Sequence, residues 1–307
     1  MFSTLQNTAK IEVTLVPEGP ILVRAQTVGI DPGVADMEFQ RTRRDGESTV
    51  FLAGSGLKGV LRSHAERILR SRDRFACDPT KTKRRQGEEL YTCGTRKAEG
   101  PEPAGYRHPY PHAGNCAACF MFGSLKLAGR FRVADAYPVV GEMWEAANRT
   151  EVRTGVGINR RSQGAQEGVL YDSEVVVGGG FRAQVSAENF SLWQLGLLLS
   201  ALDDVESGLV RIGGCKARGM GGVRVQDWSV ELGFLDSRKG FLTGARAKLA
   251  EERKFGLPQN DELQSPAATE EKQRGLFRTV RFAGEQVPSL REALIKTPLA
   301  AYLDGGT

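Results

Sequence analysis

The chain has 307 residues, of which 40% are hydrophobic and 26% are charged, and its formal net charge is +5. This size and composition allow one or two domains with a full core. The most apolar stretch, residues 192–202, is too short to cross a membrane and contains Gln194. The start has no basic segment followed by an apolar run, so we expect a cytoplasmic protein without a signal peptide or a membrane partner.

A strand and a long loop open the chain. Residues 10–16 alternate apolar and polar side chains as a half-buried strand does, and the Pro and Gly residues that follow end it. Residues 21–25 are expected to be its hairpin partner. Residues 29–48 are rich in Gly, Asp and Arg and predict a long loop, with turns at Asp31-Pro-Gly33 and Asp45-Gly46.

An amphipathic helix follows. Apolar residues recur at three- and four-residue spacing through residues 53–70. Gly54-Ser-Gly56 stands where a turn and a capping hydroxyl belong, and Lys58 and Arg62 lie one turn apart on the polar face. A helix N-terminus with amide donors and nearby cations suits a phosphate group. The alternative is a capped helix whose polar face only meets solvent.

Four of the five cysteines fall within residues 73–122, an insertion too polar to fold around an apolar core. Cys116 and Cys119 have the Cys-x-x-Cys spacing that lets two thiolates bind one ion. With Cys77 and Cys93 they would complete a tetrahedral set of four thiolates. We therefore predict a structural Zn²⁺ that supplies the stabilisation this insertion lacks.

Other arrangements of the insertion remain open. His108 or His112 could replace one of the two earlier cysteines as a ligand. The cysteines could also be buried thiols, a redox pair or disulfides, and a cytosolic location disfavours disulfides. Cys215 lies outside the insertion and is expected to be a small packed residue.

The remaining pattern predicts strands, one hairpin and one helix. Residues 130–136 and 181–185 read as strands, and the Arg-rich segment 149–180 predicts a projecting β-hairpin, with an ordinary surface hairpin as the alternative. Asn189 is expected to cap a helix that ends at residue 202. Strands at 209–212 and 223–225 would frame a second glycine-rich segment.

Basic residues gather around the two glycine-rich segments. Residues 58–107 contain thirteen Lys or Arg against seven Asp or Glu, and residues 208–224 contain four against none. Such a surplus is expected where a protein contacts a nucleic-acid backbone, although a charge run is more often a solvated face.

The order strand, helix, strand, strand, helix, strand predicts an α+β fold with a ferredoxin-like or RRM-type core over residues 1–230. The aromatic residues on which RRM sheets stack bases are absent, so RNA would be held through its phosphates. Residues 231–307 form a C-terminal extension of unknown role, with a helix expected at 242–254 and a polar linker at 259–272.

Three segments, in order, resemble the RAMP superfamily, the repeat-associated proteins of CRISPR systems. Residues 54–62 resemble its Gly-Ser-x-Leu-Lys-Gly-x-Leu-Arg signature, and residues 157–174 resemble its Ile-Asp-Arg-x-Thr-Gly-x-Ala…Glu stretch. Residues 213–221 resemble its late loop, Gly-Gly-x-Lys-Ser-Arg-Gly-x-Gly. The likeness runs over residues 10–227 and is greatest to the backbone subunit of type III effector complexes.

The resemblance implies a subunit that binds guide CRISPR RNA, assembles with other effector subunits and cleaves complementary target RNA. It implies that the residues that contact RNA are Gly54, Ser55, Lys58, Arg62, Arg160, Lys216 and Arg218.

The resemblance also implies the cleavage chemistry. Gly33-Val-Ala-Asp36 stands where similar nucleases carry Gly-x-x-Asp, which makes Asp36 the catalytic residue. The hairpin at 149–180 would be the family's thumb, which displaces a base pair of the guide–target duplex. An aspartate is a weak base at neutral pH, so Asp36 would bind Mg²⁺ or orient the attacking 2′-hydroxyl.

Three rival functions remain. One is a scaffold subunit that binds guide RNA without cleaving. A second is an endonuclease that processes precursor guide RNA through His64, on the predicted helix. A third is a zinc-stabilised RNA-binding protein outside CRISPR systems.

Overall fold

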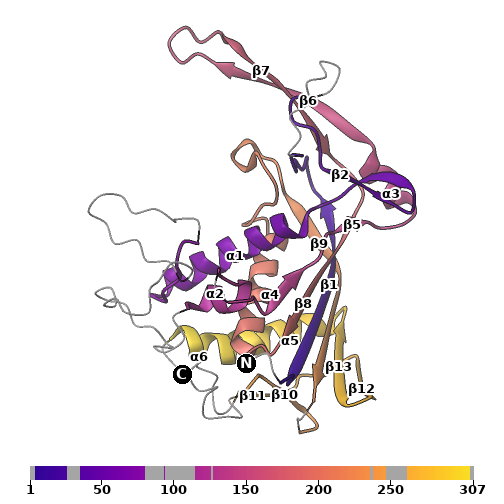
Figure 1. Cartoon of the computed structure of the whole chain (residues 1–307), viewed down its shortest axis with the longest axis vertical. Coiled ribbons are helices and arrows are strands. Elements are labelled where there is room, and N and C mark those ends of the chain that lie inside the picture. Colours follow the sequence, from indigo (N-terminus) through magenta and orange to yellow (C-terminus); the bar gives the residue numbers. More distant parts are fainter. Residues whose placement is uncertain are drawn as a thin grey trace.

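An antiparallel sheet with helices on one face and a projecting hairpin makes up the molecule (Figure 1). The computed structural model describes residues 4–25, 35–79, 93, 115–125, 127–235, 238–246 and 261–304. The strands of the main sheet lie in the order β12 (Glu270–Arg274), β13 (Phe277–Ala283), β9 (Val223–Phe234), β1 (Asn7–Pro17), β8 (Phe181–Glu188) and β4 (Phe131–Val133). The short strand β5 (Tyr137–Pro138) also pairs with β8.

Strand β1 forms the centre of this sheet because both of its edges are paired. It runs antiparallel to β8 on one side and to β9 on the other. The predicted alternation is present, since Ile11, Val13 and Leu15 are buried. The expectation that residues 21–25 pair with β1 is wrong. Ile21, the first of these residues, forms a β-bridge with Val176 instead.

Helices and three smaller sheets are added to the main sheet. The helices are α1 (Gly54–Ser71), α2 (Ala117–Phe122), α3 (Glu142–Asn148), α4 (Leu192–Glu206), α5 (Gln286–Leu294) and α6 (Ala300–Leu303), with a π-helical turn (Ile295–Leu299) between the last two. Three two-stranded sheets pair β2 (Arg41–Arg44) with β3 (Glu47–Val50), β6 (Thr150–Ile158) with β7 (Ala165–Val176), and β10 (Phe241–Thr243) with β11 (Glu262–Gln264).

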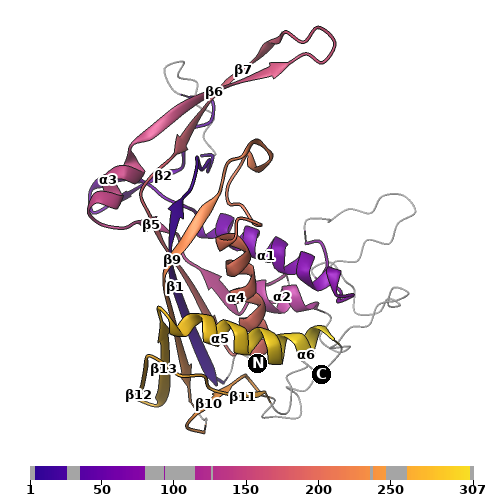
Figure 2. The ribbon, with the colours of Figure 1, turned by 180° about the vertical axis from the view of Figure 1, so that it is seen from behind.

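This arrangement confirms the predicted α+β class. The chain order β1, α1, β4, β8, α4, β9 is the predicted sequence of strands and helices, and the sheet places these strands as β9, β1, β8, β4. Helices α1, α4 and α5 lie on the same side of the sheet in both views (Figure 2). Among the described helices, none combines the length and apolar character that a membrane span requires.

The loop predicted at residues 29–48 contains a hairpin in its described part. Strands β2 and β3 are joined by Asp45 and Gly46, whose φ angles are 53° and 89°. Asp-Gly in this left-handed region is the favoured two-residue hairpin turn, which confirms the predicted turn. The turn expected at residues 31–33 lies outside the described residues.

The prediction that Asn189 caps α4 is wrong, because Asn189 bonds to a distant residue and Ser191 caps the helix. Asn189 has φ 51° and accepts a hydrogen bond from the Gln6 amide at 2.8 Å, so it joins the start of β1 instead of capping the helix. Ser191 is the N-cap, and Gln194 Oε1 accepts a hydrogen bond from the Ser191 amide at 3.1 Å.

The C-terminal extension completes the main sheet. Strand β9 continues to Phe234 and pairs with β13, and Tyr302 of α6 stacks on Trp193 of α4 at 3.8 Å between ring centroids. The helix predicted at 242–254 is wrong for residues 242 and 243, which belong to strand β10. Residues 247–254 lie outside the described part of the chain. The linker expected at 259–272 contains β11 and the start of β12.

A buried carboxylate holds the start of α4. Asp261 is 9% exposed, and its Oδ2 accepts the Leu192 amide at 2.8 Å. Burial raises the pKa of Asp261 to about 6, although the Leu192 amide and the charge of Arg246 act in the opposite direction.

We expect this carboxylate to make stability depend on pH. Between about pH 4 and pH 6 the folded chain holds a proton on Asp261 that the unfolded chain releases, because the pKa of this carboxyl in the unfolded chain is about 3.9. The contribution of Asp261 to the free energy of unfolding should therefore fall by about 3 kcal/mol as the pH rises through this window, and stay constant above it. Denaturant unfolding of the wild type and Asp261→Asn across this range measures it. A difference between the two that does not change with pH would contradict it.

Candidate metal centre and nucleic-acid interface

The first glycine-rich segment forms the first turn of α1. The helix begins at Gly54 with Ala53 as its N-cap and without a side-chain cap, so the predicted capping role of Ser55 is wrong. The Gly54 amide donates a hydrogen bond to Asp135 Oδ1 at 2.7 Å. A Cβ on Gly54 would lie 2.4 Å from the carbonyl oxygen of Val133, so glycine is needed where α1 crosses this strand. Gly54 is thus a buried packing residue, whereas Ser55 is exposed.

The second glycine-rich segment folds back on residues 20–22. The Gly214 amide donates to the Leu22 carbonyl at 2.7 Å, and the Gly221 amide donates to the Pro20 carbonyl at 2.8 Å. At Gly213, with φ 75°, a Cβ would lie 2.4 Å from the same Leu22 oxygen. Residue 22 therefore packs against the second glycine-rich segment, and residues 21 and 22 lie outside β1. Residues 209–212, predicted as a strand, form none.

The two glycine-rich segments lie against each other. Gly56 and Leu57 of α1 and Gly213, Gly214 and Cys215 of the second segment line one mainly apolar hollow of about 410 Å³. Sequence separation between these residues exceeds 150 positions, so the tertiary fold brings the predicted pair together.

Three of the predicted cations adjoin residues that line this hollow, because Lys58 follows Leu57 and the turn with Lys216 and Arg218 follows Cys215. Burial lowers the pKa of Lys58, and the charge of Arg62 lowers it further. Lys216 and Arg218 are exposed in the short 3₁₀ turn of the second segment, Lys216–Arg218. Arg160 is exposed in the turn between β6 and β7, at the far end of the projecting hairpin, and does not join this group.

The predicted hairpin at 149–180 is present as β6 and β7. Its root is held by Glu174, which accepts hydrogen bonds from the Phe39 amide at 2.8 Å, Thr150 Oγ1 at 2.6 Å and Arg41 Nη2 at 2.5 Å. Burial alone would raise the pKa of Glu174, but the bonds from Thr150 and Arg41 lower it below its usual value. The carboxylate therefore fastens the hairpin to the segment that carries Asp36.

Asp36 lies at this root. Its Oδ2 accepts the Asp172 amide of β7 at 2.8 Å, and the next residue, Met37, bridges Ser173. Asp36 is exposed. One position before Asp172, the Tyr171 hydroxyl accepts a hydrogen bond from Arg218 Nη1, and the Arg218 guanidinium lies 5.2 Å from the Tyr171 ring centroid. The hairpin root thus joins the Asp36 segment to the second glycine-rich segment.

The four cysteines of the insertion form one buried cluster. Their sulfur atoms all lie within 4.8 Å of one another, with Cys77 3.4 Å from Cys119 and 3.8 Å from Cys116. Tetrahedral zinc with bonds of about 2.3 Å to sulfur requires sulfurs roughly 3.8 Å apart. Cys77, Cys93, Cys116 and Cys119 therefore fit a zinc ion as predicted. His108 and His112 lie outside the described residues.

The ionisation of each cysteine in the cluster depends on the other three. Hydrogen bonds from Cys119, Cys77 and Cys93 lower the pKa of Cys116, whereas a hydrogen bond to Cys116, with burial, raises that of Cys93. Four thiolates at this spacing need a cation to ionise together, which a bound metal supplies.

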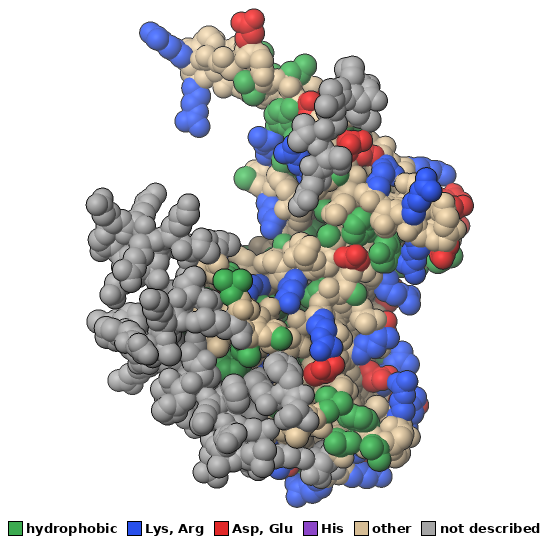
Figure 3. Space-filling model, viewed as in Figure 1, with side chains coloured by type: hydrophobic (Ala, Val, Ile, Leu, Met, Phe, Trp, Pro, Cys, Tyr) green, Lys and Arg blue, Asp and Glu red, His purple; other side chains and the backbone are tan. Residues whose placement is uncertain are grey.

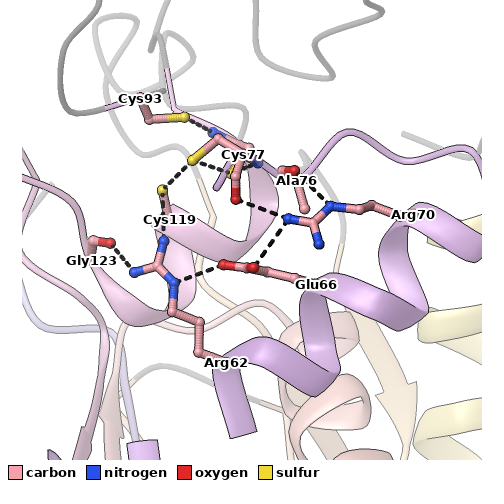
Figure 4. A network of polar contacts seen from close by, with 9 residues as sticks. Arg62, Glu66, Arg70, Ala76, Cys77, Cys93, Cys119 and Gly123 are labelled. Carbon is pink, nitrogen blue, oxygen red and sulfur yellow. Dashed lines mark hydrogen bonds and ion pairs between the residues drawn. The ribbon is translucent and has the colours of Figure 1, made fainter. Parts of the chain in front are cut away.

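Arg62 of α1 contacts this cluster (Figure 4). Its Nη2 donates to Cys119 Sγ at 3.3 Å, its Nη1 to the Gly123 carbonyl at 2.8 Å, and its Nε to Glu66 Oε1 at 2.8 Å. All three nitrogens are engaged inside the protein, and the side chain is only 16% exposed. The RNA contact implied for Arg62 stays a prediction, but the structure gives this side chain a place at the metal centre.

Glu66 and Arg70 extend the same network along α1. Glu66 Oε2 accepts Arg70 Nη2 at 3.1 Å, and Arg70 donates onward to the carbonyls of Ala76 and Cys77 at 2.9 and 3.1 Å. The helix thereby holds both the first cysteine and the segment after the last one.

A model of the RAMP superfamily matches residues 17–224. The chain belongs to the RAMP superfamily. RAMP proteins bind CRISPR RNA within multi-subunit complexes, so the chain is a CRISPR-associated RNA-binding subunit. The matched part of this RAMP chain includes both glycine-rich segments, the hairpin and the four cysteines. No curated protein matches the sequence.

The predictions from the sequence missed several residues that lie at the metal centre or beside the glycine-rich segments. Glu66 and Arg70 stand four and eight residues after Arg62, a helical spacing that could have indicated the ion-pair chain. Asp135 and Tyr171 carry no local signal, because their partners lie 81 and 47 residues away.

We expect about one zinc per chain in the purified protein, because four buried thiols at this spacing complete its coordination. Cys116→Ser should lower the zinc content, measured by elemental analysis. Cys215→Ser, outside the cluster, is the matched control and should retain the metal. Wild-type protein that is folded and free of metal would contradict the assignment.

Arg62 should support the metal centre. Arg62→Gln removes the charge beside Cys119 and should weaken zinc binding by roughly 10- to 100-fold, the usual cost of losing an outer partner of a ligand. Competition with a coloured chelator measures this. Lys58→Gln, one turn earlier on the same helix, should bind zinc like the wild type. Equal zinc affinity in both variants would show that the Arg62 contact is dispensable.

Proposed function

We propose that this RAMP chain is a guide-RNA-binding backbone subunit of a type III CRISPR effector, and that it cleaves complementary target RNA. The observation that carries the proposal is the position of Asp36, exposed and hydrogen-bonded to the root of the hairpin beside the second glycine-rich segment. The strand order β9, β1, β8, β4 with helices α1 and α4 supports a ferredoxin-like core.

Guide RNA would be bound through its backbone. Lys58 and Lys216 directly follow Leu57 and Cys215, which line the hollow between the two glycine-rich segments, and Arg218 lies in the same 3₁₀ turn as Lys216. None of these three cations makes an ion pair with a described residue. Figure 3 shows Lys and Arg side chains along the hollowed side of the molecule that faces the projecting hairpin. Contacts of this kind neutralise phosphates and carry no base readout, so binding should tolerate any sequence.

Target cleavage would follow from the hairpin and Asp36. A nucleotide displaced by the hairpin lets its ribose turn, so that the 2′-oxygen attacks the adjacent phosphorus. The 2′-hydroxyl gives up its proton to water as the new bond joins phosphorus to the 2′-oxygen, and the bond to the 5′-oxygen breaks while that oxygen takes a proton. The products are a 2′,3′-cyclic phosphate and a 5′-hydroxyl.

In this scheme Asp36 is the catalytic residue. Its carboxylate is tied to the Asp172 amide through one oxygen, which fixes its direction. It would orient the 2′-hydroxyl or hold Mg²⁺, which commonly binds one or two carboxylates together with substrate phosphates. Bound Mg²⁺ would neutralise charge on the phosphorus centre.

The same hydrogen bond favours one rival, the scaffold that does not cleave. An aspartate that accepts a backbone amide can serve only to fasten the hairpin root. The precursor-processing rival gains no support, because His64 is 5% exposed and its Nε2 lies 2.5 Å from Asp204 Oδ2.

The comparison of Asp36→Asn with Asp45→Asn separates cleavage from scaffolding. Asn keeps the shape and an acceptor for the Asp172 amide but removes the charge, so target RNA should bind as before while cleavage falls by roughly 10²-fold or more. Asp45 is exposed in the β2–β3 turn, so Asp45→Asn should leave cleavage unchanged. The readout is cutting of labelled target by the assembled complex with Mg²⁺.

A target with a 2′-deoxy residue at the cut site should resist the wild type, since the attacking oxygen is missing. Full cutting by Asp36→Asn would move the catalytic role elsewhere, and an inactive wild type would favour the scaffold.

A further inference from the structure

A second hollow lies farther along α1. Ser63, His64 and Arg67 of the helix line it on one side, and Arg211 and Lys216 line it on the other, around a volume of about 220 Å³. Ser63 and Arg67 are exposed, and Arg211 is half-buried. The predicted RNA residues include only Lys216 from this set.

The charges around this second hollow are uncompensated. Neither Arg67, Arg211 nor Lys216 forms an ion pair with any residue that the structure describes. Lys216 is exposed, and partial burial of its side chain lowers its pKa. Three unpaired cations facing one hollow attract an anion.

The neighbouring acid, Asp204, forms no ion pair with Arg67, Arg211 or Lys216 in the described part of the chain. Asp204 contacts His64, and its Oδ2 is engaged with His64 Nε2 at 2.5 Å. The other ring nitrogen of His64, Nδ1, is buried and makes no hydrogen bond to the residues that the structure describes. Ser63 adds a hydroxyl donor. The hollow therefore offers cations and polar groups to a ligand.

The two hollows follow one seam. Val60 lines both, and Cys215 of the first is followed directly by Lys216 of the second. On α1, Ser55, Gly59 and Ser63 are exposed at four-residue spacing, and the half-buried Val60 lies between the two hollows. A polyanion that leaves the first hollow along this seam reaches the second.

We propose that this second hollow binds a phosphate of the RNA backbone, next along the strand held between the two glycine-rich segments. The inference rests on the proposed RNA-binding function and extends it to Ser63, Arg67 and Arg211. RNA fits better than a protein partner, because the seam is continuous and a nucleic-acid strand carries a negative charge at every step.

The test is a salt titration of single-stranded RNA binding to the purified full chain. Arg67→Ala and Arg211→Ala should each reduce the slope of log affinity against log salt by about 0.7, and the double variant by about 1.4. Arg67→Lys keeps the charge and should keep the slope. Arg281→Ala, an exposed cation on β13, is the matched control, and thermal melting verifies that each variant is folded.

Lys58→Ala reports separately on the proposed RNA function. If it lowers the slope while Arg67→Ala and Arg211→Ala behave like Arg281→Ala, the second hollow is not an RNA site and only this inference is overturned. If none of the three differs from the control, the whole RNA path fails. Normal RNA binding combined with a failure to assemble with other subunits would assign the hollow to an acidic protein partner and overturn the inference.

Discussion

The packing of α1 against the sheet is the contact on which both candidate sites depend. Gly54 lets the helix touch the segment after β4, and buried Leu57 and Leu61 attach it to the core. With its axis fixed in this way, one side of the helix reaches the cysteine cluster through Arg62, and another side faces the second glycine-rich segment. Displacement of this helix would change the metal centre and the RNA seam together.

Ion pairing divides the cations of this RAMP chain into two groups. Arg62 and Arg70 share the carboxylate of Glu66, and Arg41 contacts Glu174, so these guanidiniums serve the fold and already have a carboxylate partner. The cations along the α1 seam make no such pairs with described residues. A cation already paired with a carboxylate must lose that partner before it can bind a phosphate, whereas an unpaired one loses nothing. This difference points to the seam as the RNA path.

The projecting hairpin depends on its root. An isolated two-stranded hairpin is only marginally stable in water, and Val156, Ile158 and Leu170 on its outer part are exposed. The contacts of Glu174 and Tyr171 at the root supply what the hairpin itself lacks. They also determine where Asp36 lies, so the direction of the hairpin and the position of the carboxylate are set by the same few bonds.

Local patterns in the sequence determined α1, β1, β8, the hairpin and the four-cysteine cluster, because periodicity and ligand spacing act over short distances. The tertiary structure alone decided that Arg41 pairs with Glu174, that Gly54 is buried against Val133, and that Asn189 binds Gln6 instead of capping α4. It also made the C-terminal extension part of the main sheet. These outcomes depend on partners far away in the chain, and a side chain's neighbours across the fold leave no trace in the residues beside it.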